Sequence, residues 1–317
     1  MKVKIKRSDT SGQVKIPSSK SHTIRAIYLA SLAKGHSRIK EALISSDTRS
    51  AIEVCRSFGA TIRSRENTIE IDGLEGHPGI PDDVIDVGNS GTSLRIGLST
   101  AALINGYTVF TGDEQIKNRT LQPLMTALNN LGAQVFSIKD NGKAPVIVKG
   151  VAKGGVTELE AISSQYLSSL LINAPLFQND TEIRLTLLNE RPYVDMTLNW
   201  LDKQNIKYEN DNYKTFHIKG GQAYQAFDQS IPGDFSSASF FLGLGALSDN
   251  EVILENLDMN DTQGDKLVIE YLKQMGASVS WDEDRLIIKG GKLKGARIDM
   301  NNTPDALPIM AVVACFA

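Results

Sequence analysis

A pattern that recurs roughly every seventy residues limits what this chain can fold into more than any other feature of its sequence. In each copy a helical segment ends, in most copies at Gly-Ala, and two short strands with a turn between them follow. The copies are anchored at Gly59, Gly132, Asn205 and Gly276, which are spaced by 73, 73 and 71 residues. β-Branched alternation indicates the strands, as in TIEID and VIVKG.

Short polar turns recur in the same register, and each precedes a mostly apolar segment. The turns are SSKS (18–21), NSGTS (89–93), ISSQ (162–165), DFSS (234–237) and NNTPD (301–305). The segments that follow have the length and the Leu-rich or small-residue composition of helices. Because they are apolar on most sides, we expect these helices to be buried and parallel, with their N-terminal ends on one side. The repeat therefore predicts a strand, a polar turn, a buried helix, a second helix and a hairpin.

The basic residues within or just after these turns point to an anionic ligand. Ser, Thr, Asp and Asn are ordinary N-caps, so the turns alone indicate only capping. Lys20, Arg25 and Arg95 are different, because a cation near a helix start opposes the helix dipole unless an anion is bound there. Several helix N-termini that converge form a strong anion site.

Composition excludes several classes of protein. The 317 residues are 41% hydrophobic, which suffices for one large or two medium domains. A net charge of −3 and a pI of about 5.9 argue against a nucleic-acid partner. No apolar stretch is long enough to cross a membrane, and no apolar run follows the basic start as in a signal peptide. We expect a cytoplasmic protein without a membrane or nucleic-acid partner.

Cysteine and histidine patterns predict neither a metal site nor a redox motif. Cys55 and Cys315 form no CxxC pair, which indicates two free thiols in a reducing compartment and leaves a disulfide between them open. His22 is expected in a loop, and no histidine stands at metal-ligand spacing from another His or from a Cys; the others are His36, His77 and His217. Walker, GxGxxG, GxSxG and HExxH motifs are absent from the sequence.

Five separated motifs resemble one family, the 5-enolpyruvylshikimate-3-phosphate synthases (3-phosphoshikimate 1-carboxyvinyltransferases) among the enolpyruvyl transferases. They are PSSKSHTIRA, GNSGTSLR, ISSQYLSSLL, GDFSSASFFL and DMNNTPDALP, in the family's order and at family-like separations. The resemblance implies an α/β fold, a two-domain inverse α/β barrel of βαβαββ units around buried parallel helices. It places residues 17–231 in a domain of three repeats, and residues 1–16 with 232–317 in a second domain. The family closes its two domains around the ligand.

The resemblance also implies the reaction and its setting. The enolpyruvyl group of phosphoenolpyruvate passes to the 5-hydroxyl of shikimate 3-phosphate with release of phosphate, a transfer of an alkyl or aryl-type group in the shikimate pathway to chorismate and aromatic amino acids. C3 of phosphoenolpyruvate is protonated, the hydroxyl attacks C2, and the tetrahedral intermediate loses phosphate. Neither metal nor organic cofactor takes part. Family members are mostly monomers.

The roles of single residues follow from matching the motifs position by position. For shikimate 3-phosphate these are Lys20, Ser21, Arg25, Ser163, Ser164, Gln165, Tyr193 and Asp305. For phosphoenolpyruvate they are Lys20, Asn89, Gly91, Thr92, Arg95, Arg119 and Gln165. Lys20 would touch both substrates and Asp305 would act as general base. Gly91 would let its backbone approach the phosphate, because it has no Cβ.

This chain departs from the family at a few positions. Glu190 stands where the family usually has Ser, and an acid there would repel a bound phosphate unless Arg191 compensates. We therefore leave Glu190 out of the predicted site. Ile96 and Thr120 replace prolines that are common after the two matched arginines, which suggests at most an altered inhibitor response.

The last repeat leads to three alternatives. The fifth repeat stops at Ala317 after its first helix and no sixth follows, so we expect an incomplete second domain, weak substrate binding and little catalysis. The chain is a fragment of a synthase, a relative with a different acceptor, which Glu190 favours, or a truncated non-catalytic binding protein. A relative that acts on a UDP-sugar is disfavoured, because that branch uses a loop cysteine and both cysteines here lie in predicted helices.

Overall fold

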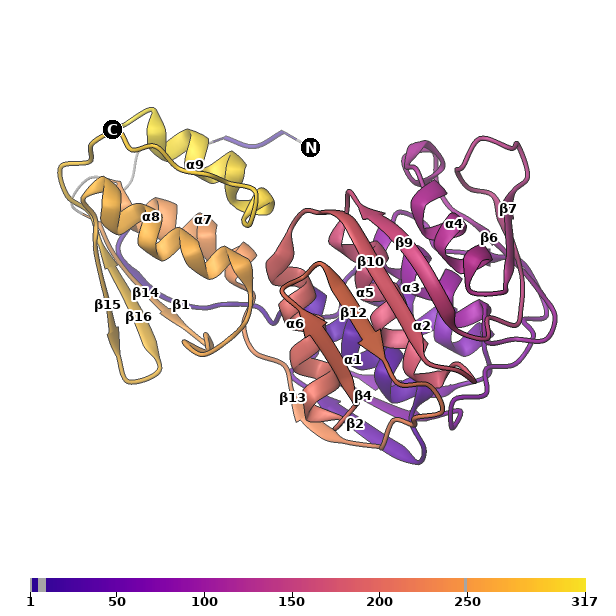
Figure 1. Cartoon of the computed structure of the whole chain (residues 1–317). Helices are drawn as coiled ribbons and strands as arrows, with labels where there is room; N and C mark the ends of the chain where they lie inside the picture. The colour runs from indigo at the N-terminus through magenta and orange to yellow at the C-terminus, as the bar shows by residue number, and fades with distance from the viewer. Residues whose placement is uncertain (1, 5–9, 248–249) are drawn as a thin grey trace. The chain divides into compact units, whose positions relative to one another are not determined.

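The computed structural model describes residues 2–4, 10–247 and 250–317, which divide into two compact units (Figure 1). One unit comprises Met1–Ser19 and Pro232–Ala317, and the other Lys20–Ile231. Each has its own hydrophobic core, as the separate clusters of buried side chains show. The two units are described in turn.

The larger unit contains three sheets of four strands with the same arrangement. In each, two strands are parallel, and the second of them pairs with an antiparallel hairpin. The orders are β13-β2-β4-β3, β5-β6-β8-β7 and β11-β12-β10-β9. The strands are β2 (His36–Lys40), β3 (Thr61–Arg65), β4 (Thr68–Asp72), β5 (Ile85–Asp86), β6 (Tyr107–Thr111), β7 (Gln134–Ser137), β8 (Val146–Lys149), β9 (Gly155–Ala161), β10 (Thr181–Leu188), β11 (Tyr208–Asp211), β12 (Thr215–Ile218) and β13 (Asp228–Ser230).

Three buried helices form the middle of this unit, and Figure 1 shows them behind β9, β10 and β12. They are α1 (Lys20–Leu32), α3 (Gly91–Ala101) and α5 (Ser164–Asn173), and nearly all their side chains are buried. Each is followed by a strand and a second, amphipathic helix: α2 (Ser46–Ser57), α4 (Gln122–Asn130) and α6 (Arg191–Lys203). Two short 3₁₀ helices, η1 (Ile116–Asn118) and η2 (Ala174–Leu176), complete the unit.

Small polar side chains let α3 and α5 pack closely. The hydroxyls of Ser99 and Ser169 are 2.5 Å apart, and Thr100 donates to Oδ1 of Asn173 at 3.0 Å. All four residues are almost fully buried, so these bonds satisfy groups that have lost water. The contact keeps the two helices in a fixed register, which also sets the position of their first turns.

The smaller unit contains one sheet of the same kind, in the order β1-β14-β16-β15. Its strands are β1 (Gly12–Lys15), β14 (Glu251–Glu255), β15 (Ser278–Asp282) and β16 (Arg285–Lys289). Its helices are α7 (Phe235–Ala246), η3 (Gly264–Leu267), α8 (Val268–Met275), η4 (Pro304–Ala306) and α9 (Leu307–Ala314).

In each unit, one edge strand comes from the segment of chain that leads into the other unit. β13 immediately precedes α7 in the chain, yet it pairs in parallel with β2 of the larger unit. β1 precedes α1 and pairs in parallel with β14 of the smaller unit. Each sheet thereby obtains a parallel edge strand beside its central strand, and the chain crosses between the units twice.

The repeat correctly predicted the hairpins and the buried helices α1, α3 and α5 of the α/β fold. For the last apolar segment the prediction of a buried helix was wrong, because in α9 only Met310 and Val313 are buried. The expected strands TIEID and VIVKG lie in β4 and β8, and each predicted apolar segment contains a helix. The loop predicted around His22 was wrong: α1 begins at Lys20, so His22 is helical and buried, and it accepts from Nε1 of Trp200 at 2.9 Å. Cys55 is buried in α2, and Cys315 is exposed at the end of α9; both are free thiols.

Among the described residues, no helix combines the length and the hydrophobicity that crossing a membrane requires.

Candidate active site

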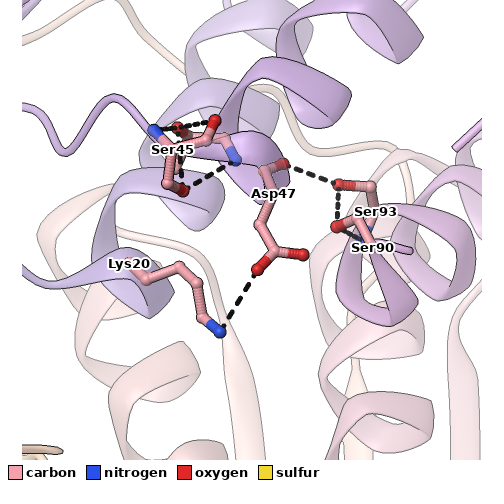
Figure 2. A network of polar contacts seen from close by, with 6 residues as sticks. Lys20, Ser45, Asp47, Ser90 and Ser93 are labelled. Carbon is pink, nitrogen blue, oxygen red and sulfur yellow. Dashed lines mark hydrogen bonds and ion pairs between the residues drawn. The ribbon is translucent and has the colours of Figure 1, made fainter. Parts of the chain in front are cut away.

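The first turns of α1, α2 and α3 are tied together by polar contacts. Figure 2 shows Nζ of Lys20 turned toward Asp47, with 3.3 Å between Nζ and Oδ2. Ser93 donates to the carbonyl oxygen of Asp47 at 3.4 Å, and Ser90 donates to Ser93 at 2.7 Å. A cation, a carboxylate and two hydroxyls from three helices of two repeats therefore lie together where the helices begin.

Gly91, the first residue of α3, lies beside two arginine side chains. A Cβ built on Gly91 would be 2.5 Å from Nη1 of Arg95, 2.9 Å from Nη1 of Arg119 and 3.6 Å from Oε1 of Gln165. Arg95 donates to that oxygen at 2.7 Å. A side chain here would collide with these groups, so the absence of a Cβ lets both guanidinium groups approach the backbone at the start of α3, and two cations at a helix N-terminus suit a phosphate or carboxylate.

Arg95 is the more buried of these two arginines, with 6% of its surface exposed. Its guanidinium carbon lies 5.3 Å from the centre of the Tyr166 ring, and no described residue accepts a hydrogen bond from its Nε. Burial lowers the pKa of Arg95; Tyr166 acts against this shift, Arg119 adds to it, and Glu190 acts against it. A desolvated cation beside a second cation is stabilised by an incoming anion.

The start of α5 carries the second predicted group. Ser163 caps the helix and accepts from the backbone nitrogen of Gln165 at 3.4 Å. Ser164 is buried, and both its backbone nitrogen and its hydroxyl donate to Oε2 of Glu190, at 3.2 Å and 2.8 Å. Glu190 immediately precedes α6 and has a left-handed backbone, with φ 55° and ψ 42°. The helix end that was expected to hold a ligand phosphate therefore holds a carboxylate of the chain itself.

Arg25 joins three helices of the larger unit. Only 3% of its surface is exposed, and burial lowers its pKa to about 10. Its nitrogens donate to Thr197 at 2.9 Å, to the carbonyls of Ser21 and Tyr193 at 3.0 Å and 2.9 Å, and to Ser168 at 3.4 Å. These bonds connect α1, α5 and α6, so Arg25 braces the fold in addition to any contact with a ligand.

The remaining predicted residues lie around these groups or in the other unit. Asn89 is exposed in the turn before α3 and donates to Gln115 at 3.0 Å, and Thr92 is half-buried in the first turn of α3. Tyr193 is half-buried in α6. Asp305 belongs to the smaller unit, where it is exposed in η4.

Sequence reasoning missed some polar residues of the site. Asp47 stands in ISSDT (44–48), a polar turn before a helix like the five predicted ones, so the same signal would have found it. Ser168 and Thr197 gave no signal, because each lies inside a helix. Glu190 was left out although it contacts Ser164 directly. Among the described residues, no three His, Cys, Asp or Glu side chains are grouped so that they could hold a metal ion.

Comparison with known proteins shows which family the chain is similar to. The profile of the family described as EPSP synthase (3-phosphoshikimate 1-carboxyvinyltransferase) matches residues 5–317. Proteins named 3-phosphoshikimate 1-carboxyvinyltransferase are 57% identical in Acetivibrio thermocellus and 54% identical in Ruminiclostridium cellulolyticum, each over 317 residues, 100% of this chain and 75% of the relative.

Solved structures show the same fold. EPSP synthase from Acinetobacter baumannii superimposes with a TM-score of 0.83 at 25% identity, over 96% of this chain and 71% of that one. The enolpyruvyl transferase NikO from Streptomyces tendae gives a TM-score of 0.72 at 16% identity, over 98% of this chain and 73% of that one. At 16% identity the second likeness concerns the fold alone.

Proposed function

The chain belongs to the EPSP synthase (3-phosphoshikimate 1-carboxyvinyltransferase) family, and we propose that its larger unit binds the anionic groups of shikimate 3-phosphate and phosphoenolpyruvate for enolpyruvyl transfer. The reaction forms a bond between the 5-oxygen of the acceptor and C2 of phosphoenolpyruvate. The C2–O bond to phosphate breaks, and phosphate leaves. C3 gains a proton in the addition and loses one in the elimination, so the carbon–carbon double bond is restored and the product is an enol ether.

The close approach of Arg95 and Arg119 to Gly91 is the observation that supports this proposal most. Phosphoenolpyruvate carries a phosphate and a carboxylate, and Arg95 and Arg119 offer two guanidinium groups beside the backbone of α3. Gln165 keeps Arg95 in place. We assign phosphoenolpyruvate to these residues together with Lys20, and expect Asn89 and Thr92 to shape the turn.

We assign the acceptor to the starts of α1, α5 and α6. Ser163 and Ser164 would hold the 3-phosphate at the N-terminus of α5, where backbone N–H groups and the helix dipole favour an anion. Ser21, Tyr193 and Arg25 would line the ring and its carboxylate, with Gln165 between the two substrates. From the family resemblance alone we propose that Asp305 accepts the proton of the 5-hydroxyl and that Lys20 contacts both substrates.

Calorimetry and an assay of phosphate release test the assignment. Shikimate 3-phosphate should bind the 317-residue chain saturably, and phosphoenolpyruvate should bind in its presence and release phosphate only when both are added. Arg119→Ala should weaken phosphoenolpyruvate binding about tenfold or more, since a charge-assisted contact is lost. Arg63→Ala, an exposed position on β3, should change nothing. If neither substrate binds, the proposed function is wrong.

A second candidate is enolpyruvyl transfer to a different cyclic alcohol, and the contact between Glu190 and Ser164 favours it. An acceptor without phosphate at that position would not compete with the carboxylate. Tighter binding of shikimate than of shikimate 3-phosphate would support this candidate. The proposal further places the enzyme in the cytoplasm as a monomer, which light scattering of the purified chain would test for oligomeric state.

A further inference from the structure

The carboxylate of Glu190 occupies the hydrogen-bond donors at the beginning of α5. Both donors come from Ser164: the backbone N–H lies 3.2 Å from Oε2, and the hydroxyl lies 2.8 Å from the same oxygen. Ser164 is 1% exposed, so these donors have exchanged water for the carboxylate. Each donor has one proton, so a ligand anion that accepts from both must displace Glu190.

The surrounding charges favour an anion at this place. Burial lowers the pKa of Arg95, and Glu190 is one of the groups that act against this shift, so its carboxylate interacts electrostatically with one of the two guanidiniums near Gly91. Arg191, the residue that could have compensated the acid, contacts other groups. Its guanidinium carbon lies 3.6 Å from the centre of the Tyr213 ring, and its Nε is 4.0 Å from Oδ2 of Asp195.

We propose that Glu190 is a specificity-determining residue that acts as an internal anion: it holds the start of α5 in the empty site and leaves it when the 3-phosphate of the acceptor binds. This inference rests on the proposed function, which assigns Ser163 and Ser164 to that phosphate. The ligand then has to displace a bound carboxylate and tolerate a like charge nearby, so the observed affinity is lower than the donors alone would give. Acceptors without the phosphate avoid this competition, and Glu190 therefore sets how strongly the site selects a phosphorylated acceptor.

Calorimetry with three probes and three variants tests this role. The probes are shikimate 3-phosphate, shikimate and inorganic phosphate. The variants are Glu190→Gln, which removes the charge with little change in shape, Glu190→Ser, which empties the position, and Glu209→Gln, a control with the same charge change at an exposed position on β11. Circular dichroism checks that each variant is folded.

We expect both Glu190 variants to bind shikimate 3-phosphate and inorganic phosphate about tenfold more tightly than the unmodified chain, because like charges side by side cost binding free energy. Shikimate should bind them within about twofold of the unmodified chain, since it meets no charge competition. Glu209→Gln should alter no affinity. In the ¹⁵N spectrum, the Ser164 amide should shift in both Glu190 variants and, in the unmodified chain, on addition of phosphate.

The outcomes separate this inference from the proposed function. If shikimate 3-phosphate binds the unmodified chain but the Glu190 variants bind it equally or more weakly, the internal-anion role is wrong. If those variants lose affinity for shikimate instead, Glu190 is a ligand for an acceptor hydroxyl, which also overturns the inference. If shikimate 3-phosphate binds no form while the variants bind phosphate more tightly, the displacement by anions holds and the assigned acceptor is wrong.

Discussion

Nη1 of Arg95 donates a hydrogen bond to Oε1 of Gln165 at 2.7 Å, and this contact joins two motifs that lie seventy positions apart. The oxygen also lies 3.6 Å from the place where a Cβ on Gly91 would be. Gln165 thus fixes the guanidinium of a buried arginine beside the first residue of α3. Because Arg95 lies in α3 and Gln165 in α5, the proposed anion site needs residues from two successive repeats.

Gln165→Glu should show whether the contact between Arg95 and residue 165 contributes to folding stability, to ligand binding or to both. The new carboxylate would keep the acceptor and neutralise Arg95, so the free energy of unfolding should stay equal or rise. Affinity for phosphoenolpyruvate should fall about tenfold or more, because a fixed anion competes with the ligand for the same cation. Urea unfolding and calorimetry with saturating shikimate 3-phosphate measure the two effects. Gln134→Glu, exposed on β7, is the control and should change neither.

Gly91→Ala should weaken the binding of phosphoenolpyruvate without unfolding the protein. The added methyl group would lie 2.5 Å from Nη1 of Arg95 and 2.9 Å from Nη1 of Arg119, so both guanidinium groups must move. We expect affinity to fall about tenfold, with a change in unfolding free energy below about 1 kcal/mol, since alanine suits a helix better than glycine. Gly295→Ala is the matched control, because nothing lies within 4 Å of its Cβ position. Unchanged affinity in Gly91→Ala would contradict the assigned cradle.

Arg25→Met should destabilise the larger unit by about 3 kcal/mol, because it removes several hydrogen bonds and leaves buried partners such as Thr197 and Ser168 with fewer donors. The fluorescence of Trp200 in urea reports on this unit, provided that Trp281 of the other unit is replaced by Phe in all samples. Arg63→Met, on the exposed surface, should stay within about 0.5 kcal/mol. Equal stability of both variants would show that Arg25 does not brace the helices.

Cys55 should make the stability of the protein fall at alkaline pH. Burial raises the pKa of its thiol from 9.0 to about 12, so the folded chain keeps the proton where the unfolded chain loses it. The stabilising contribution is complete below pH 9 and is lost as pH rises toward 12. Between pH 8.5 and 10 the unmodified chain should lose about 1 kcal/mol more unfolding free energy than Cys55→Ala.

The same burial predicts how the thiols react. At pH 8 a thiol reagent should modify one cysteine of the folded chain, the exposed Cys315, and two after denaturation. Cys315→Ser should then leave no reactive thiol in the folded state. Rapid modification of Cys55 in the folded Cys315→Ser variant would contradict its burial.

Local patterns in the sequence determined where the elements begin. Ser90, Ser163 and Asp234 are N-caps in the structure, and each stands in a predicted polar turn. Capping depends on one side chain and the backbone two or three residues later, so it can be recognised without the fold. Gly276, an anchor of the repeat, ends α8 with a left-handed backbone for the same local reason.

Only the tertiary structure decided which of these turns act together. Arg119 reaches Gly91, Glu190 reaches Ser164, and Arg25 lies buried among α1, α5 and α6, although nothing in the local sequence of these residues specifies their partners. β13 likewise pairs with β2, although the two strands lie near opposite ends of the larger unit's sequence. Contacts between distant segments depend on how buried helices pack and which strands share a sheet. The sequence by itself therefore determined the repeat, the helix starts and the family, whereas packing decided that one helix start holds Glu190 and that another lies against two arginines.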